Sequence, residues 1–492
     1  MKTIPSIISA LIAFFAFIQP SFAQVTLDVL DTQNKNDSEN ITLAQFLEGL
    51  EQTHPLFERE EMNAQIEQER QKSLTGAENW IVSSGVNVNH MSYSPVTAGL
   101  ENTNGVSLFT NVSRHFWSTG GNLSVGLTLG TNALGYSSDT IYSSMPDADF
   151  DNKVTLSYTQ PLLRNWKGVL NKLEYELKAI DIDFATVQAL ENQEDFLASS
   201  AQSFLNWVFY IVEMQIVQER LQLSKKSFDE TRQKKARNLV DEVDVIRAKN
   251  SISLSEQNRV TVESVLLSLV KQLSILTQDV SLVDKTPQFD LYEIHEFPEL
   301  KTVIDDFKKN SRVLGQLKLN LRQLELVRKG NKEYTKADLS LTAQVGTKKS
   351  DDNFSDALMI DQPEATLGLT YTFPLKNTQA RANLLTTDLQ ITQLNKQMEE
   401  LEIAQVSVLS NTYVKLKQLE EILKLNIQQI ELARQKTIEE TITYNRGRGD
   451  FTFVIQSQDE EKRAKLTYAL NALIYQKLYI QYLAMTDQLL SY

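Results

Sequence analysis

The sequence predicts a mostly helical protein that also carries amphipathic membrane strands, built from a duplicated helix–strand–strand–helix unit. Two stretches of about 65 residues, 171–235 and 378–444, have helical periodicity and contain neither proline nor glycine. At about 1.5 Å per residue each would form a rod of order 100 Å, too long for an ordinary globular domain. Elsewhere apolar and polar residues alternate with a period of two, as in strands with one apolar face.

The composition excludes several classes of function. The chain of 492 residues carries 49 Lys and Arg against 63 Asp and Glu, and this net charge of −14 argues against nucleic acid as a partner. The absence of cysteine excludes disulfide scaffolds, thiol catalysis and cysteine-bound metals. The four histidines share no ligand spacing, and the sequence has no nucleophile elbow, phosphate loop or HExxH motif. We therefore expect no enzymatic activity, no cofactor and no metal.

Residues 1–23 are expected to be a signal peptide. Lys2 precedes a short apolar core, Ile7–Ile18, and Ser21-Phe22-Ala23 fits the small-x-small rule for cleavage. Residues 24–40 are assigned to an N-terminal linker. The remaining sequence nowhere contains about 18 consecutive apolar residues, so such a secreted chain is either soluble or enters an outer membrane as β-strands.

The first structural repeat is assigned to residues 41–277. A helix over 41–76 is expected to begin with Thr42 as its N-cap and to break near Pro55. Strands follow over about 80–160, and a long helical hairpin over about 171–277 completes the repeat.

Aromatic residues flank these strands. Trp80 stands before the first strand and Trp166 after the last, as expected of residues at a membrane interface. A soluble sandwich would show the same alternation along its strands, so these tryptophans favour membrane strands.

The second half of the chain follows the same plan. Residues 278–297 contain Pro287 and are assigned to a linker, and residues 298–492 form the second structural repeat. Its helix spans about 299–330, its strands about 337–375 and its long helical hairpin about 378–490.

A short motif marks the strand-to-helix junction of each half. Leu-Ser-Tyr-Thr-Gln-Pro-Leu at 156–162 matches Leu-Thr-Tyr-Thr-Phe-Pro-Leu at 369–375 in five of seven positions. Pro161 and Pro374 cannot donate a hydrogen bond to a sheet, so each is expected to end its strand before the long helix. The match in letters and in order indicates an internal duplication.

With these features the sequence resembles the outer-membrane efflux (TolC) family over nearly the whole chain after residue 23. The resemblance implies a homotrimer in which each chain gives four strands to one outer-membrane β-barrel and its helices to a long periplasmic α-helical barrel. This duct would stay closed at its periplasmic tip until a periplasmic adaptor and an inner-membrane RND or ABC pump engage it. The implied function is the exit duct of an efflux or type I secretion system for drugs, small molecules or proteins.

Physical chemistry also requires an oligomer. Four amphipathic strands cannot close a barrel around water, and an open edge in lipid leaves backbone groups unpaired, whereas three chains would give twelve strands. The first half carries about 44 more residues between its helix and its junction than the second half. We expect these residues to form an enlarged external hairpin, the alternative being additional barrel strands.

The turns at the tips of the long hairpins hold the candidate gate residues. They are Asp241, Asp244, Tyr444, Arg446, Arg448 and Asp450. The resemblance assigns the positions of Asp244 and Tyr444 to polar links that hold the tip closed. The family's second-half Asp and Arg are Phe453 and Gly449 here, which leaves Arg446 or Arg448 as substitutes. Our hypothesis is that Asp244 pairs across the tip with Arg448, with Tyr444 hydrogen-bonding nearby.

Two alternatives stay open at this point. The charges at the tips are also consistent with ordinary solvated helical turns, because exposed pairs contribute little. The whole chain is also consistent with a secreted or periplasmic coiled-coil structural or adaptor protein. An adaptor, however, would have one helical hairpin flanked by compact β domains, whereas strands here interrupt the helices at two matching places.

Overall fold

The computed structural model describes residues 40–93, 100–136 and 147–490. The expected signal peptide and nearly all of the expected N-terminal linker lie outside these residues. None of the helices in the described ranges has an apolar segment long enough to cross a membrane. The chain divides into two compact units: unit 1 (Met1–Met62, Val187–Gly315 and Glu399–Tyr492) and unit 2 (Asn63–Thr186 and Gln316–Met398).

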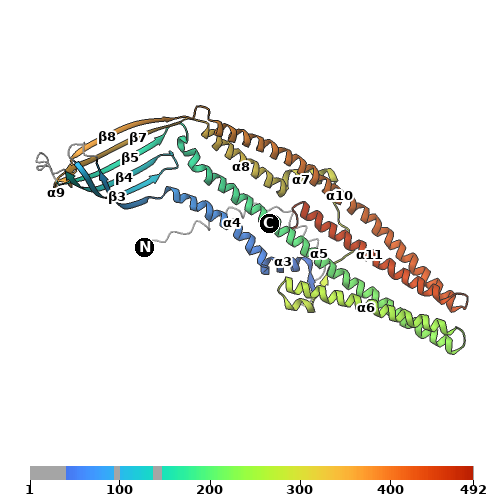
Figure 1. Ribbon diagram of the computed structural model, residues 1–492. Helices are drawn as coiled ribbons and strands as arrows, with labels where there is room; N and C mark the ends of the chain where they lie inside the picture. Colours follow the sequence, from blue (N-terminus) through green and yellow to red (C-terminus); the bar gives the residue numbers. More distant parts are fainter. Residues whose placement is uncertain (1–39, 94–99, 137–146, 491–492) are drawn as a thin grey trace, which may run out of the picture. The chain divides into compact units, whose positions relative to one another are not determined.

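Unit 2 contains a six-stranded sheet in which every strand is antiparallel to its neighbours (Figure 1). The alternating sequences form strands because a pleated backbone points successive side chains to opposite faces. The strands cross the sheet in chain order: β2 (Ile81–Ser92), β3 (Leu100–His115), β4 (Asn122–Tyr136), β5 (Ala148–Pro161), β7 (Asp338–Asp351) and β8 (Gln362–Thr372).

The expectation of an external hairpin in the first half is wrong. The additional residues form β3 and β4, which pair with each other and also with β2 and β5 along their lengths. At 16 and 15 residues they are as long as β5 and β7, which have 14 each. Within the described residues this sheet therefore has six strands and not four. Alternation in the sequence shows the face of each residue but not which strand lies beside it.

The two faces of this sheet differ in polarity across all six strands. One face is lined by exposed aliphatic side chains, and Val86, for example, lies opposite Leu108 and is 61% exposed. The other face carries Ser, Thr, Asn and Gly, including a hydrogen bond of 3.1 Å between the hydroxyls of Thr159 and Thr342. The apolar residues of the first face include Val82, Val88, Val106, Leu108, Val125, Leu127, Leu156, Val345, Leu367, Leu369 and Tyr371.

Four long helices have pairwise equal lengths. α5 (Val169–Ala236) and α10 (Thr378–Asn445) have 68 residues each, and α6 (Glu242–Leu276) and α11 (Phe451–Met485) have 35 each. All four begin within two residues of the positions expected from the sequence. The other helices are α3 (Leu43–Thr53), α4 (Pro55–Leu74), α7 (Leu300–Asn310), α8 (Arg312–Tyr334) and the short α9 (Phe354–Ala357).

Both junction prolines stand where a strand gives way to a helix. Pro161 is the last residue of β5, and Pro374 follows β8. After Pro161, Asn165 adopts a left-handed φ of 63°, and its side-chain oxygen accepts the N–H of Leu170 at 2.9 Å. Asn tolerates this conformation better than most residues, so it turns the chain into α5 at little cost.

In unit 1 the predicted N-cap Thr42 begins α3. Its hydroxyl accepts the N–H of Gln45 at 3.2 Å, and the Gln45 side chain accepts the N–H of Thr42 at 3.0 Å, which is a capping box. The break expected near Pro55 is confirmed: α3 ends at Thr53, and Pro55 is the first residue of α4. A short strand β1 (Asn40–Thr42) runs parallel to β6 (Thr286–Gln288).

The segment expected to be a linker, 278–297, is packed into unit 1. Leu282 and Leu291 are 1% and 2% exposed. His295 is also buried: its ring stacks on Tyr479 with centroids 3.9 Å apart and its Nε2 lies 3.1 Å from the Gln476 side-chain oxygen. Burial lowers the pKa of His295. These contacts fix the segment to α11.

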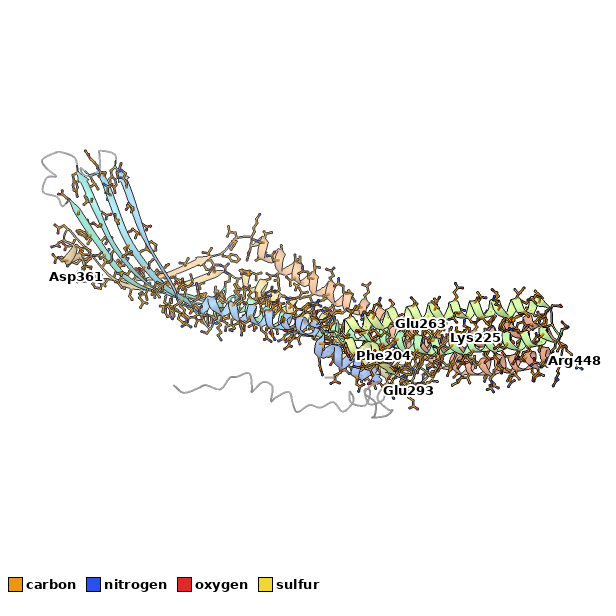
Figure 2. All side chains as sticks on the ribbon, turned by 90° about the horizontal axis from the view of Figure 1, so that it is seen from below. Phe204, Lys225, Glu263, Glu293, Asp361 and Arg448 are labelled. Carbon is orange, nitrogen blue, oxygen red and sulfur yellow. The ribbon has the colours of Figure 1, made fainter. Side chains whose placement is uncertain are left out.

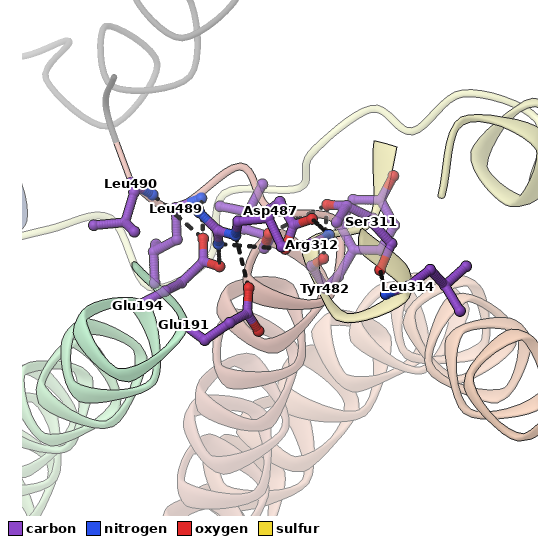
Figure 3. A network of polar contacts seen from close by, with 11 residues as sticks. Glu191, Glu194, Ser311, Arg312, Leu314, Tyr482, Asp487, Leu489 and Leu490 are labelled. Carbon is purple, nitrogen blue, oxygen red and sulfur yellow. Dashed lines mark hydrogen bonds and ion pairs between the residues drawn. The ribbon is translucent and has the colours of Figure 1, made fainter. Parts of the chain in front are cut away.

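A buried ionic network lies at the junction of α7 and α8 (Figure 3). The Arg312 guanidinium pairs with Glu191 at 2.7 Å, with Asp487 at 3.3 Å and with Glu194. Glu194 also accepts the N–H of Leu489 at 3.0 Å, so the network holds the end of α11 and the following segment against α5. Among the described residues these three carboxylates are close enough to share a metal ion, but Arg312 already lies among them.

Removing the positively charged Arg312 side chain should destabilise unit 1 strongly. Arg312 is 9% exposed and Glu194 3%, so Arg312→Ala leaves buried carboxylates without a partner. We expect a loss of about 3–5 kcal/mol in the free energy of unfolding, measured by urea denaturation followed by circular dichroism. The control Arg328→Ala breaks an exposed pair with Asp388 and should cost less than about 1 kcal/mol. Equal losses in the two variants would contradict the role given to Arg312.

The same network should make stability depend on pH. Burial raises the pKa of Glu191 from its ordinary 4.5, although Arg312 opposes the shift. Its contribution is therefore fully present below about pH 4.5 and is lost as pH rises through the folded-state pKa. Glu191→Gln imitates the protonated acid, so its stability relative to the wild type should grow between about pH 4.5 and pH 7.5 in urea denaturation. A difference that stays constant with pH would refute this.

Candidate functional site

The candidate site consists of the two turns at the ends of the long helices of unit 1. Asn238 in the α5–α6 turn and Gly447 in the α10–α11 turn have positive φ values of 52° and 73°. Asp241 and Asp450 are the N-cap residues of α6 and α11, and the Asp450 carboxylate accepts the N–H of Thr452 at 2.7 Å. Arg448 lies on the second turn, at the end of these helices (Figure 2).

A small apolar cluster supports both turns. Tyr444, Phe451, Val454 and Ala248 are buried together, and the Tyr444 and Phe451 rings lie 5.1 Å apart. These residues come from α6, α10 and α11, so the cluster joins the two hairpins. Apolar contacts of this kind fix the helices without restricting the charged side chains on the turns.

The Tyr444 hydroxyl is buried and has no hydrogen-bond partner among the described residues. Burial raises the pKa of Tyr444, an effect that the nearby Thr231 reduces. The Lys234 ammonium lies 3.7 Å from the centre of the Tyr444 ring and donates to the Asn445 side chain at 2.8 Å. Burial lowers the pKa of Lys234. Tyr444 is thus held by packing and by a cation–π contact.

Two acidic residues, Asp244 in the first half and Asp450 in the second, share a cation that sequence reasoning missed. Arg247 of α6 pairs with Asp244 at 3.1 Å and with Asp450 at 3.8 Å. Hydrogen bonds from Thr452, helped by Arg247, lower the pKa of Asp450. The three-residue spacing of Asp244 and Arg247 on one helix was the available signal for the first pair.

The remaining charges of the turns are exposed. Within the described part of the chain Asp244 pairs with Arg247 and not with Arg448, so the pairing predicted from the sequence is not made inside one chain. The side chains of Asp241, Arg446 and Arg448 make no ion pair with any described residue and are exposed. They are available to another molecule.

A basic groove lies beside the turns, between α6 and α11, with a volume of about 490 Å³. Arg220 of α5 is buried at its wall, pairs with Asp459 at 2.9 Å and donates to the Ser251 hydroxyl at 3.1 Å. Lys462 and Arg463 also line the groove. Burial lowers the pKa of Lys462. No local sequence pattern indicated this groove, because its walls come from three separate helices.

The tryptophans named from the sequence lie at one end of the sheet in unit 2. Trp80 directly precedes β2 and Trp166 follows β5, and both side chains are about half exposed, at 50% and 46%. The strand pairing places the start of β2, the end of β5 and the β3–β4 turn that contains Trp117 at the same end of the sheet.

The packing of Tyr444 predicts a different outcome for two substitutions. Tyr444→Ala removes a buried ring and should lower the free energy of unfolding by about 3 kcal/mol. Tyr444→Phe keeps the ring and removes a hydroxyl that has no partner in the described part of the chain, so stability should be unchanged or slightly higher. Urea denaturation of both variants tests this. If the Phe variant lost as much stability as the Ala variant, the hydroxyl and not the ring would be the important group.

Comparisons with known proteins agree on the fold. No family model matches the sequence, and no curated protein matches it. The outer membrane protein VceC from Vibrio cholerae has a similar structure with a TM-score of 0.64 and 11% identity, covering 91% of this chain and 95% of VceC. CusC, described as forming a transmembrane channel, gives 0.67 and 10%, covering 93% and 95%.

A third structure extends this agreement. The CmeC outer membrane channel from Campylobacter jejuni gives a TM-score of 0.64 and 10% identity, covering 93% of this chain and 90% of CmeC. These likenesses confirm the resemblance to the outer-membrane efflux (TolC) family at the level of the fold of the single chain. The chain therefore has the fold of the outer-membrane channel proteins.

Proposed function

We propose that the chain is a member of the outer-membrane efflux family and forms the passive exit duct of a tripartite efflux or type I secretion system. It would assemble as a homotrimer in the bacterial outer membrane and extend into the periplasm, where an adaptor and an inner-membrane RND or ABC pump engage it. The duct performs no bond chemistry and needs no cofactor. Its fold, shared with outer-membrane channels, supports this proposal.

One observation carries the membrane part of the proposal. The sheet exposes one continuous aliphatic face, and its opposite face is polar. Water would penalise such a face, whereas lipid accommodates it and a polar lumen accommodates the other. Trp80 and Trp166, which flank β2 and β5 at the same end of the sheet, suit the membrane interface.

The equal helix lengths support an internal duplication. The long helices of each half match at 68 and 35 residues, and the related motifs at Pro161 and Pro374 precede the first helix of each pair. Two halves with equal helix lengths would contribute similar pairs of helices to a helical barrel. The β3–β4 pair then belongs to the first half alone.

We place the gate at the turns of unit 1. Within each chain Arg247 links Asp244 to Asp450, while Asp241, Arg446 and Arg448 are free to pair with a neighbouring copy. Exposed pairs contribute about 0–1 kcal/mol each, so docking of a partner supplies enough energy to separate them. The basic groove beside the turns suits an acidic partner surface.

Purified protein in a planar bilayer tests the duct and its gate together. The wild type should be a trimer by light scattering and give small, mostly closed channels. Asp244→Ala combined with Arg448→Ala should raise the open fraction, by about fivefold for each kcal/mol of lost pairing. The control Arg434→Ala removes an exposed pair with Glu431 on α10 and should not change the conductance.

Two results would contradict the proposal at different levels. An unchanged open fraction in the double variant would remove the gate assignment and leave the duct. A water-soluble monomer without conductance would remove the duct, and the structural or adaptor protein considered from the sequence would replace it.

A further inference from the structure

The sheet of unit 2 is open, with β2 at one edge and β8 at the other. We propose that β8 of one chain pairs with β2 of the next, so that three chains close one barrel of about eighteen strands. The inference rests on the proposed channel function. It differs from the twelve-stranded barrel implied by the resemblance, because each chain gives all six strands of its sheet to the wall and not four.

We call this pairing of β8 with β2 of the next chain the seam, and the directions of the two strands permit it. Six strands that alternate in direction leave the two edge strands antiparallel to each other. A copy placed beside the first therefore continues the antiparallel pattern, and a ring of copies closes with the same pairing at every seam. Antiparallel pairing throughout is the arrangement of bacterial outer-membrane barrels.

Side-chain faces also agree across the seam. The start of β2 and the end of β8 lie at the same end of the sheet by the strand register. When these ends are brought level, Val82 lies beside Tyr371, both on the apolar face, and Ser83 beside Thr370, both on the polar face. Shifts of two residues keep this match.

Neither edge is protected against pairing along most of its length. Residues 81–89 of β2 and 365–372 of β8 contain no charged residue and no proline, and Pro363 and Glu364 stand only near the start of β8. Soluble sheets protect their edges with such residues, because an open edge recruits other strands. Val82 and Leu367 are 64% and 74% exposed, so the apolar face extends to both edges of the sheet.

A single chain does not close this barrel. Its sheet is open, and about eight strands are needed before side chains fill the interior of a barrel, so six would leave no channel. Eighteen strands at a spacing of about 4.8 Å and a tilt of about 40° give roughly 36 Å between opposite backbones, against roughly 24 Å for twelve. A helical or extended polypeptide, about 10–12 Å across, would pass such an opening with water around it.

The polar face is suited to a wide lumen. Gly85, Gly105, Gly126, Gly130, Gly346 and Gly368 all lie on this face. Its charged residues include Lys153 and Glu364, which pair with each other, and Lys348, which lies 3.9 Å from Glu364. Small side chains and a neutralised charge cluster leave the bore open to both small molecules and unfolded protein.

Cysteine cross-linking tests the seam without background, because the natural chain contains no cysteine. Ser83→Cys on β2 is combined in turn with Thr366→Cys, Thr370→Cys or Thr372→Cys on β8, since the stagger between copies is a multiple of two residues. At least one combination should give covalent dimers and trimers on a denaturing gel after oxidation. The control series replaces Ser83→Cys with Ser124→Cys on β4. In a barrel that left β2 and β3 outside, β4 would be the edge strand and would lie beside β8 of the next chain. If all six strands form the wall, this series should give only monomers.

The outcomes separate this inference from the proposed function. Cross-linked trimers from the Ser124 series and not from the Ser83 series would overturn the seam, as would a trimer by light scattering that cross-links in neither series. A monomer by light scattering would overturn the channel proposal itself. Electron cryomicroscopy of the wild type provides a measurement free of variants: a barrel near 36 Å supports eighteen strands, and one near 24 Å excludes them.

Discussion

Backbone pairing is the physical constraint on which unit 2 depends. An aliphatic face exposed on every strand is stable where lipid replaces water, but lipid offers no hydrogen bonds to a strand edge. Each of the six strands therefore needs neighbours on both sides, and inside one chain β2 and β8 each have only one. The alternation that makes the face apolar thus also makes an isolated chain incomplete. Assembly follows from the same pattern that specifies the strands.

Unit 1 has strong polar networks in its interior and weak ones at its turns. Arg312 and Arg220 are buried, and each has several partners, so breaking either network exposes the full cost of an unpaired buried charge. At the turns, by contrast, Arg247 is 43% exposed and Asp450 53%, and water screens their interaction. The helices are therefore held firmly by their interior, while the charges at the turns can exchange partners at small cost.

The sequence predicted what depends on local pattern and missed what depends on distant partners. The Thr42 cap, the four long helices and the junction prolines follow from residues within a few positions of one another. Arg312 was missed because its partners lie near positions 191 and 487, and no local pattern joins them. The β3–β4 pair was assigned to a hairpin because alternation is identical in a free hairpin and in a sheet.

The geometry of the turns explains why Asp244 pairs with Arg247 and not with Arg448, the partner predicted from the sequence. Asp244 is only 17% exposed and is already satisfied by Arg247, so a pairing with Arg448 would first have to break an existing contact. Asp241 carries no such contact and is exposed, which makes it the less costly acidic partner for Arg446 or Arg448 of a neighbouring copy. With Phe453 exposed where the resembled family has an acid, the turns lack one acidic position and gain cations. In the proposed duct, the electrostatic selectivity at these turns should therefore depend on the arginines more than on a ring of carboxylates.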